Sequence, residues 1–320
     1  MQSSKPGPGL INLGLIGAGR WGRNYIKTLA ALDGVRLARL ASRNPESASL
    51  VDTGCVISAD WRVLVDAGDL DGIIVATPPA EHAAMAAAAL AARVPVLVEK
   101  PLTMAVAEAQ QLLAQSRSQR SLVMVEHTHL FHPAFEELCR QRAALGAIRA
   151  IRGDAGNHGP YRTDVPVLWD WGPHDVAMCI AVTGQVPRAR AAVREERREV
   201  DGGIGESIRL ELGWDDGVRG DISLSNIADR QRRFTVFCED GVLVYDDMGQ
   251  QKLVIHPAQD GNSQPEGMGR TVPVAKEFPL TRAVRAFVAA IAASDSVHPS
   301  LALGVDVVGV LADCARLIDQ

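Results

Sequence analysis

The feature that most constrains this chain is an alternation of short apolar runs with longer helical patterns between residues 11 and 126. Parallel strands need helical crossovers, so this alternation is typical of βαβ units. It predicts a doubly wound α/β sheet with helices on both faces. The expected strands cover residues 11–17, 35–42, 55–57, 72–76, 94–98 and 122–126, and the expected helices cover residues 21–33, 45–52, 60–67, 80–92 and 103–117.

A glycine-rich segment lies where the first expected strand meets the first expected helix. It reads Gly17-Ala18-Gly19-Arg20-Trp21-Gly22, a GxGxxG pattern. The first glycine permits the tight turn, the second lets the backbone approach a pyrophosphate, and the third lets the helix lie close to the strand. A glycine turn without a ligand is the alternative. The strand before it and the helix after it favour a dinucleotide-binding site of the Rossmann type.

The residues after the second expected strand bear on the choice of cofactor. NAD sites usually carry an acidic residue about 20 positions past the glycines, which binds the ribose hydroxyls. Ser42 and Arg43 stand there instead. A carboxylate would repel a 2′-phosphate, whereas an arginine and a hydroxyl can bond it. The sequence therefore predicts NADP(H) in preference to NAD(H), with a solvated loop arginine as the alternative.

Other candidate residues follow the fourth, fifth and sixth strands, whose carboxyl ends are where open α/β sheets bind ligands. Lys100 is expected to project from the fifth strand, because Pro101 biases it toward an extended conformation. The expected cofactor contacts are Gly17, Gly19, Arg20, Trp21, Gly22, Ser42, Arg43, Thr77, Pro78, His82, Glu99, Lys100 and His127.

The pattern changes beyond residue 127. Helical patterns at 133–141 and 172–183 flank a strand at 147–154 and a long polar loop, and five strands with tight turns then run from 189 to 246. Successive strands with tight turns predict an antiparallel sheet. We expect an NAD(P)-binding domain over residues 1–127 and an α+β domain over residues 128–320. The second domain would have a large, open sheet that binds substrate and supports a homodimer or homotetramer.

The polar loop and the helix after it carry a second candidate constellation. Gly172-Pro173 is interpreted as the start of a helix, which places His174 in the first turn, where the helix dipole disfavours an imidazolium. Asp170 precedes it by four residues. The alternative is that the acidic residues cap the helix and His174 fills a polar niche. The candidate substrate contacts in the loop, which could equally be solvated, are Asn157, Tyr161 and Arg162.

Composition excludes several classes of protein. The hydrophobic fraction is 47% and no apolar stretch approaches the ~20 residues of a membrane span. A net charge of −5 without a basic block argues against nucleic acid as the partner. The five cysteines are scattered without a CxxC, so neither disulfides nor a thiolate metal site are expected. We expect a cytoplasmic protein that binds a small molecule and no membrane.

Three motifs together resemble those of the Gfo/Idh/MocA family, the glucose–fructose oxidoreductase and inositol dehydrogenase group. They are the glycine-rich segment, Glu99-Lys100-Pro101 and the stretch from Asp170 to Asp175, and the resemblance covers nearly the whole chain. Residues 19–24, 126–133 and 167–170 are similar to the branch that oxidises nucleotide-linked sugars at a ring hydroxyl. Ser42-Arg43 departs from the acidic residue expected of the NAD-using members of that branch.

The resemblance implies an enzyme that moves a hydride between nicotinamide and a ring hydroxyl or ketone of a sugar or sugar nucleotide, and Ser42-Arg43 predicts that its cofactor is NADP(H). It implies that Lys100 and His174 face the reactive carbon from opposite domains, with Asp170 as the third member. Either Lys100 or His174 could exchange the proton. His127, His129 and His132 form a cluster of a kind that can bind metal, but the resemblance implies no metal and we expect none.

Two other functions stay open. A regulator that senses NADP(H) without chemistry would need only the first domain, and the presence of Lys100, Asp170 and His174 argues against it. An NAD-dependent glycosidase or imine reductase on the same scaffold is compatible with the sequence, because a fold does not fix a function.

Overall fold

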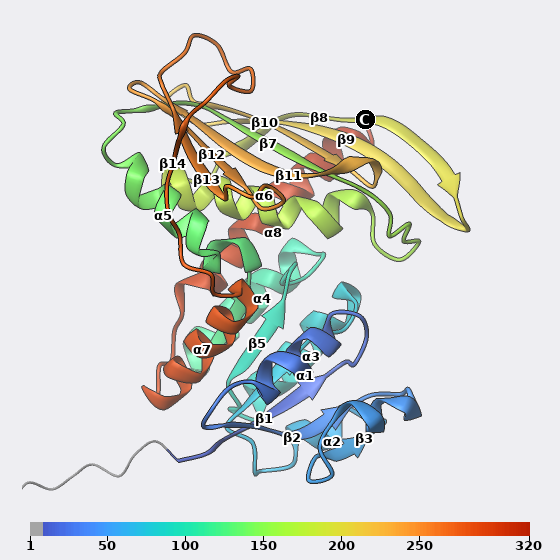
Figure 1. Ribbon diagram of the computed structural model, residues 1–320. Coiled ribbons are helices and arrows are strands. Elements are labelled where there is room, and N and C mark those ends of the chain that lie inside the picture. Colours follow the sequence, from blue (N-terminus) through green and yellow to red (C-terminus); the bar gives the residue numbers. More distant parts are fainter. Residues whose placement is uncertain (1–8) are drawn as a thin grey trace, which may run out of the picture. The chain divides into compact units, whose positions relative to one another are not determined.

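The computed structural model describes residues 9–320, which form two compact units (Figure 1). The first unit comprises the described residues up to Glu126 together with Leu280–Val305. The second comprises His127–Pro279 and Asp306–Gln320.

The first unit is built on a six-stranded parallel sheet, which confirms the doubly wound fold. Its strand order is β3-β2-β1-β4-β5-β6, so the direction of winding reverses between β1 and β4, where such folds bind ligands. The four residues of each of β4, β5 and β6 are all buried, as expected for strands covered on both faces. The strands are β1 (Ile11–Ile16), β2 (Val35–Ala41), β3 (Val56–Ser58), β4 (Gly72–Val75), β5 (Val96–Glu99) and β6 (Val123–Glu126).

Helices connect these strands at the places that the sequence predicts, with one difference in type. The expected helix over residues 45–52 is a 3₁₀ helix, in which Ser49 donates a side-chain hydrogen bond to the Glu46 carbonyl. Such local serine bonds compete with the α-helix. The helical elements are α1 (Gly22–Ala30), η1 (Pro45–Leu50), α2 (Arg62–Val65), η2 (Pro79–Glu81), α3 (His82–Ala91) and α4 (Val106–Gln119).

A segment from the far end of the chain completes the first unit. Helix α7 (Pro279–Ala292) packs on β4, where a Cβ on Gly72 would lie 3.0 Å from Phe287 and 2.8 Å from Ile291. The hydroxyl of Ser300, in helix α8 (Pro299–Ile318), accepts a bond from the Val125 backbone N–H. This grouping differs from the sequence-based division, which assigned all of residues 128–320 to the second domain.

The second unit is built on an eight-stranded sheet, of order β14-β13-β12-β11-β7-β10-β9-β8. All its pairs are antiparallel except β7 with β10, which confirms the mostly antiparallel sheet. The strands are β7 (Ile148–His158), β8 (Arg188–Val200), β9 (Gly203–Gly213), β10 (Arg219–Ser225), β11 (Ile227–Cys238), β12 (Val242–Asp246), β13 (Leu253–His256) and β14 (Arg270–Thr271).

Helices cover one face of this sheet (Figure 1). They are η3 (Thr128–Phe131), α5 (Pro133–Arg142), α6 (Val167–Thr183) and the second part of α8. At Gly172 of α6, an added Cβ would meet Leu311 of α8 at 2.8 Å and Leu224 of β10 at 3.5 Å. Helix α6 is thus closely packed between the sheet and α8, and thirteen of its residues are buried. In the described part of the chain, no helix combines the length and the hydropathy of a membrane span.

Candidate functional site

The turn between β1 and α1 has the geometry that the glycine pattern predicts. Gly17 has a φ of +99°, and a Cβ there would lie 2.6 Å from the Ala76 carbonyl oxygen at the end of β4. A Cβ on Gly22 would lie 2.0 Å from the Gly17 carbonyl oxygen. Around Gly19, by contrast, no atom comes within 4 Å of an added Cβ. The first and third glycines close the turn, and the second borders open space that a ligand can occupy.

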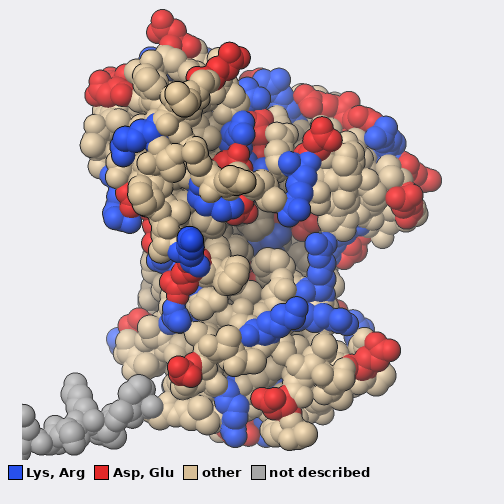
Figure 2. All heavy atoms as spheres, in the orientation of Figure 1, with Lys and Arg blue, Asp and Glu red and all other residues tan. Residues whose placement is uncertain are grey.

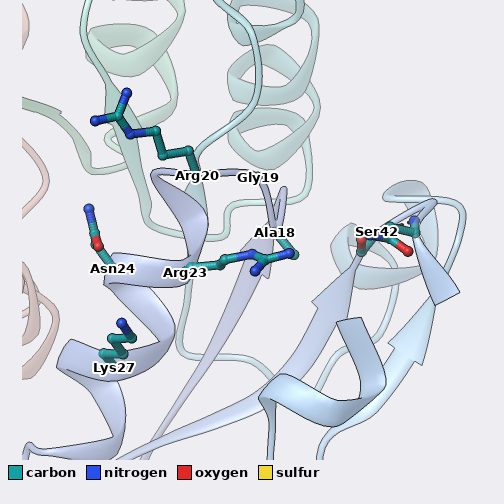
Figure 3. Close-up of a pocket in the computed structure, with 8 residues that line it drawn as sticks. Ala18, Gly19, Arg20, Arg23, Asn24, Lys27 and Ser42 are labelled. Carbon is teal, nitrogen blue, oxygen red and sulfur yellow. Dashed lines mark hydrogen bonds between the residues drawn. The ribbon is translucent and has the colours of Figure 1, made fainter. Parts of the chain in front are cut away.

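A pocket of about 530 Å³ opens beside this turn (Figure 3). Its volume lies within the ~300–1,000 Å³ typical of sites for small molecules and cofactors. The lining residues include three cationic side chains and no acidic one, and they are Ala18, Gly19, Arg20, Arg23, Asn24, Lys27, Ser42 and Asn44. The pocket therefore offers an anion both the open glycine turn and positive charge.

The structure separates the two residues that the sequence assigned to cofactor choice. Ser42 lines the pocket, and its hydroxyl lies 2.8 Å from that of Ser47. Arg43 is not among the lining residues. Its side chain is 83% exposed, and its Nη2 lies 3.8 Å from Glu81 Oε1. A weak, exposed pair of this kind leaves the arginine in solvent.

The end of β5 is held by a buried hydrogen-bond network around Glu99. Its Oε1 accepts hydrogen bonds from the Trp21 indole N–H and, at 2.7 Å, from the Tyr25 hydroxyl, and its Oε2 accepts from the Lys100 backbone N–H at 3.3 Å. Burial raises the pKa of Glu99 to about 7, although these bonds and the positive charge of Lys100 act in the opposite direction. Glu99, a predicted cofactor contact, links the glycine-rich segment to Lys100 through these bonds.

His82 holds the other side of the same strand end. One ring nitrogen lies 2.8 Å from the Pro101 carbonyl oxygen and the other lies 2.9 Å from the Thr77 carbonyl oxygen. The ring is fully buried, and burial lowers the pKa of His82. His82 therefore ties the segment after β4 to the residue that follows Lys100. The backbone of Lys100 is fixed from both sides.

In the second unit, the sequence-based start of the helix that carries His174 is wrong. Helix α6 begins at Val167, and Pro173 lies inside it, so His174 is the eighth residue of the helix and not in its first turn. The dipole effect is confined to the terminal turn, so it does not govern this imidazole. The start is marked by Pro166, whose carbonyl oxygen accepts from the Trp169 and Asp170 backbone N–H groups.

The beginning of α6 is anchored by a buried carboxylate that the sequence analysis missed. Glu206 of β9, 2% exposed, accepts a hydrogen bond from the Val167 backbone N–H at 3.2 Å. Arg194 and Arg197 of β8 lie 3.2 and 3.5 Å from its other oxygen. Three groups thus share the charge of Glu206 and fix the position at which α6 starts.

Two of the candidate substrate residues, Tyr161 and Arg162, lie in the loop that leads into α6, and Asn157 lies near the end of β7. Arg162 forms a two-bond pair with Asp164, at 2.9 and 2.7 Å, and its Nη1 lies 3.8 Å from Asp170. Asn157 donates to the Gly159 carbonyl oxygen at 3.2 Å. In the same loop, the Tyr161 carbonyl oxygen packs against Gly203. Asp170 and the loop arginine are therefore brought together, while Asn157 has a local partner.

His129, which the sequence analysis did not assign to the site, lies next to His174, and Tyr245 lies next to His129. The ring of His129 meets that of His174 edge-on, with 4.9 Å between centroids. His129 Nδ1 in turn lies 2.9 Å from the hydroxyl of Tyr245, a fully buried side chain on β12. Because 116 residues separate His129 from Tyr245, no local sequence signal could pair them.

Two of the three clustered histidines, His129 and His132, lie against the ring of Tyr245. His132 Nδ1 accepts from the Ala134 backbone N–H at the start of α5, and its Nε2 lies 3.4 Å from Asp247. The ring of His129 meets that of His174 edge-on, and His127 is buried directly after β6. Over residues 9–320, no group of three or more His, Cys, Asp or Glu side chains is arranged to hold a metal ion.

Comparison with known proteins identifies the family. The NAD-binding Rossmann-fold model of the GFO/IDH/MocA oxidoreductase family matches residues 11–127, and the model of its C-terminal domain matches residues 139–244. UDP-N-acetylglucosamine 3-dehydrogenase of Acidithiobacillus ferrooxidans is 26% identical to this chain, and the match covers 88% of this chain and 89% of that enzyme. Inositol 2-dehydrogenase 2 of Saccharopolyspora erythraea is 26% identical to this chain, and the match covers 66% of this chain and 70% of that enzyme.

The comparison extends to solved structures. A crystal structure from Magnetospirillum magnetotacticum MS-1 has a TM-score of 0.90 and 47% identity, and the match covers 95% of this chain and 99% of that one. The matches to both family domains confirm the resemblance that the three motifs indicated. With a Rossmann domain, a glycine turn open to a ligand and these relatives, the chain belongs to the GFO/IDH/MocA family of oxidoreductases.

Proposed function

We propose that the protein transfers a hydride between NADP(H) and a ring carbon of a sugar or sugar nucleotide, interconverting a hydroxyl and a ketone. The observation that carries the proposal is the pocket beside the glycine turn, with its cationic lining. The open space around Gly19 fits the cofactor, because backbone N–H groups there can approach a pyrophosphate. When bound, the nicotinamide supplies or accepts the hydride.

The preference for NADP(H) is supported by the charge of the pocket. Ser42 offers a hydroxyl where NAD sites usually place a carboxylate, and none of the lining residues is acidic. A 2′-phosphate carries about −1.5 to −2 charges at neutral pH and would meet attraction here and no repulsion. Structural relatives are described in complex with NADP and in complex with NAD, so the cofactor has to be decided by this chain's own residues.

The substrate class is supported by the relatives that cover most of the chain. UDP-N-acetylglucosamine 3-dehydrogenase and inositol 2-dehydrogenase are both named for oxidation at a position on a six-membered ring that bears hydroxyl groups. A ring polyol presents several neighbouring hydroxyls, which polar side chains can select by hydrogen bonding. In this chain Asn157, Tyr161 and Arg162 are the proposed contacts.

For the chemistry, we assign three residues. The Lys100 ammonium donates a hydrogen bond to the reacting oxygen and polarises it, and His174 exchanges the hydroxyl proton as general acid and base. Asp170 orients the substrate or the histidine. The contact from His129 holds the His174 ring in one orientation, and Tyr245 holds His129.

The experiment is a matrix of cofactors and substrates. UDP-N-acetylglucosamine, myo-inositol and free glucose would be offered with NADP⁺ and with NAD⁺, and formation of the reduced cofactor would be followed at 340 nm. Ring-hydroxyl oxidation that is faster with NADP⁺ supports the proposal. Turnover of cyclic imines or glycosides instead, or tight cofactor binding without turnover of any compound, would replace it by an imine reductase, a glycosidase or a sensor.

Two further expectations belong to the same proposal. A homodimer or homotetramer would form through the face of the eight-stranded sheet opposite to α6, and the enzyme would work in the cytoplasm. Light scattering of the purified protein tests the first expectation, and fractionation of the cells that make it tests the second.

A further inference from the structure

Four polar residues follow one face of α1 and the turn before it. Arg20, Arg23, Asn24 and Lys27 have the spacing i, i+3, i+4 and i+7, which places them on the same side of a helix, and all four line the pocket. Figure 2, in the orientation of Figure 1, shows Lys and Arg atoms as a band across the region of α1. The side of the helix that faces the pocket is therefore strongly cationic.

This arrangement is unfavourable for an isolated helix. Arg23 lies in the first turn of α1, where the helix dipole repels positive charge, and that turn contains no acidic residue. Arg23 and Lys27 are also like charges at i and i+4, a spacing that destabilises a helix. Lys27 alone has a structural explanation, because it lies in the last turn, where the dipole favours a cation. The placement of Arg23 has no such compensation within α1, and an anion in the pocket would supply it.

The direction of the Arg23 side chain identifies which anion. In Figure 3 it extends from α1 across the turn toward Ser42, whereas Arg20 points away from Ser42. Ser42 follows β2 directly, at the position where Rossmann domains hold the adenosine ribose. Asn44 also lines the pocket, and its backbone N–H donates to the Ser42 hydroxyl at 3.3 Å. Its side-chain amide nitrogen can donate although its Oδ1 already accepts from the Glu46 N–H.

We propose that Arg23, assisted by Lys27, binds the 2′-phosphate of NADP(H) and sets the cofactor preference, in place of Arg43. The phosphate would lie between the guanidinium of Arg23 and the hydroxyl of Ser42. A planar guanidinium can form two parallel bonds to a phosphate, which gives both strength and selectivity. This inference rests on the proposed NADP(H) dependence and names the residues responsible for it.

The test compares Arg23→Ala, Lys27→Ala and Arg43→Ala by calorimetric titration with NADPH and NADH. Arg23→Ala should weaken NADPH binding by about 10–100-fold and change NADH binding by less than about 3-fold. Lys27→Ala should give a smaller loss with the same selectivity. Arg43→Ala, the matched control from the same segment as Ser42, should change neither affinity by more than about 3-fold. Arg23→Lys should recover part of the lost NADPH affinity, because charge is kept but the two-bond geometry is lost.

Two fragments of the cofactors show which phosphate Arg23 binds, and they need no sugar substrate. Adenosine 2′,5′-bisphosphate should lose affinity in Arg23→Ala to the same extent as NADPH, and adenosine 5′-phosphate should not. Equal losses for both fragments would mean that Arg23 serves a phosphate common to both cofactors, and a selective loss in Arg43→Ala would restore Arg43. Either result overturns the inference. A wild-type protein that binds NADH as well as NADPH would instead overturn the proposed cofactor preference, and the absence of sugar turnover would overturn only the proposed reaction.

Discussion

Trp21 donates a hydrogen bond from its indole nitrogen to the carboxylate of Glu99, across 78 residues of sequence. Trp21 belongs to the glycine-rich segment, and Glu99 directly precedes Lys100. The bond therefore joins the turn that would hold the cofactor to the strand end that bears the proposed catalytic lysine. The buried hydroxyl of Tyr25 donates to the same carboxylate, so the two motifs are parts of one hydrogen-bond network.

The titration of Glu99 should make stability depend on pH. Burial raises the pKa of this carboxyl from 4.5 to about 7, so folding favours its protonated form. The contribution of this carboxyl to the free energy of unfolding is complete below pH 4.5 and is lost as the pH rises through 7. Glu99→Gln removes the titration. When the pH is raised from about 5 to about 8, the free energy of unfolding of the wild type should therefore fall by on the order of 1–3 kcal/mol relative to that of the variant.

Urea unfolding at the two pH values measures this difference. Asp71→Asn is the control, because Asp71 accepts a backbone N–H bond from Asn12 at the opposite end of the same sheet and reports the effect of a carboxylate-to-amide exchange alone. Parallel pH profiles for the wild type and Glu99→Gln would show that Glu99 is charged in the folded protein throughout this range.

Two glycine substitutions should separate binding from folding. Gly19→Val should fold normally and lose cofactor binding, because its side chain would enter the open space beside the pocket. Gly22→Val should lose about 3 kcal/mol or more of stability, since even a Cβ would lie 2.0 Å from the Gly17 carbonyl oxygen. Thermal unfolding and titration with NADPH measure both properties. A folded Gly19→Val protein that keeps its NADPH affinity would refute the assignment of this turn.

Lys100 and His174 should act on one substrate oxygen as a unit. Positioned proton transfer is worth ~10²–10⁴ in rate, so Lys100→Met and His174→Ala should each lower kcat by about that factor and keep most of the cofactor affinity. Groups that work together give non-additive losses, so the double variant should be little slower than the worse single variant. Single-turnover oxidation followed by cofactor absorbance measures this. Near wild-type turnover in His174→Ala would make the histidine structural and leave the proton to Lys100 or Tyr161.

Tyr245→Phe should show whether the contact with His129 orients His174. The exchange keeps the ring but removes the hydroxyl that lies 2.9 Å from His129, so we expect kcat to fall about 10-fold with little change in KM. Thr235→Val is the matched control. It removes another buried hydroxyl bond, to Gln264, from the neighbouring strand β11, and should lower stability but not kcat. Equal effects of the two substitutions on kcat would contradict an orienting role for Tyr245.

What could be predicted from the sequence was mostly local. The strand, glycine turn and helix at residues 11–30 are consecutive, and each part carries its own signal, so the fold of this region followed from the pattern. The start of α6 was missed because Gly172-Pro173 is a common way to begin a helix. Here Pro173 is tolerated inside one, and Pro166 and Glu206 fix the true start.

Contacts between distant segments could not be predicted in the same way. Whether Arg23 or Arg43 borders the pocket depends on how α1 lies against the end of β2, which neither segment encodes alone. Likewise, nothing near His129 indicates that Tyr245 lies beside it. Helix α7 has an apolar stripe that predicts burial of one face, but this pattern does not predict that the face packs on β4.

The packing of α7 on β4 also has a consequence for the way the protein is made. A ribosome releases all six strands of the first unit long before it releases Phe287 and Ile291, which cover Gly72. Until then the nascent sheet has an apolar surface without its final cover, and such surfaces promote aggregation during synthesis. The first unit thus matures only after most of the second has been translated, and a chain that stops early should depend on chaperones to stay in solution.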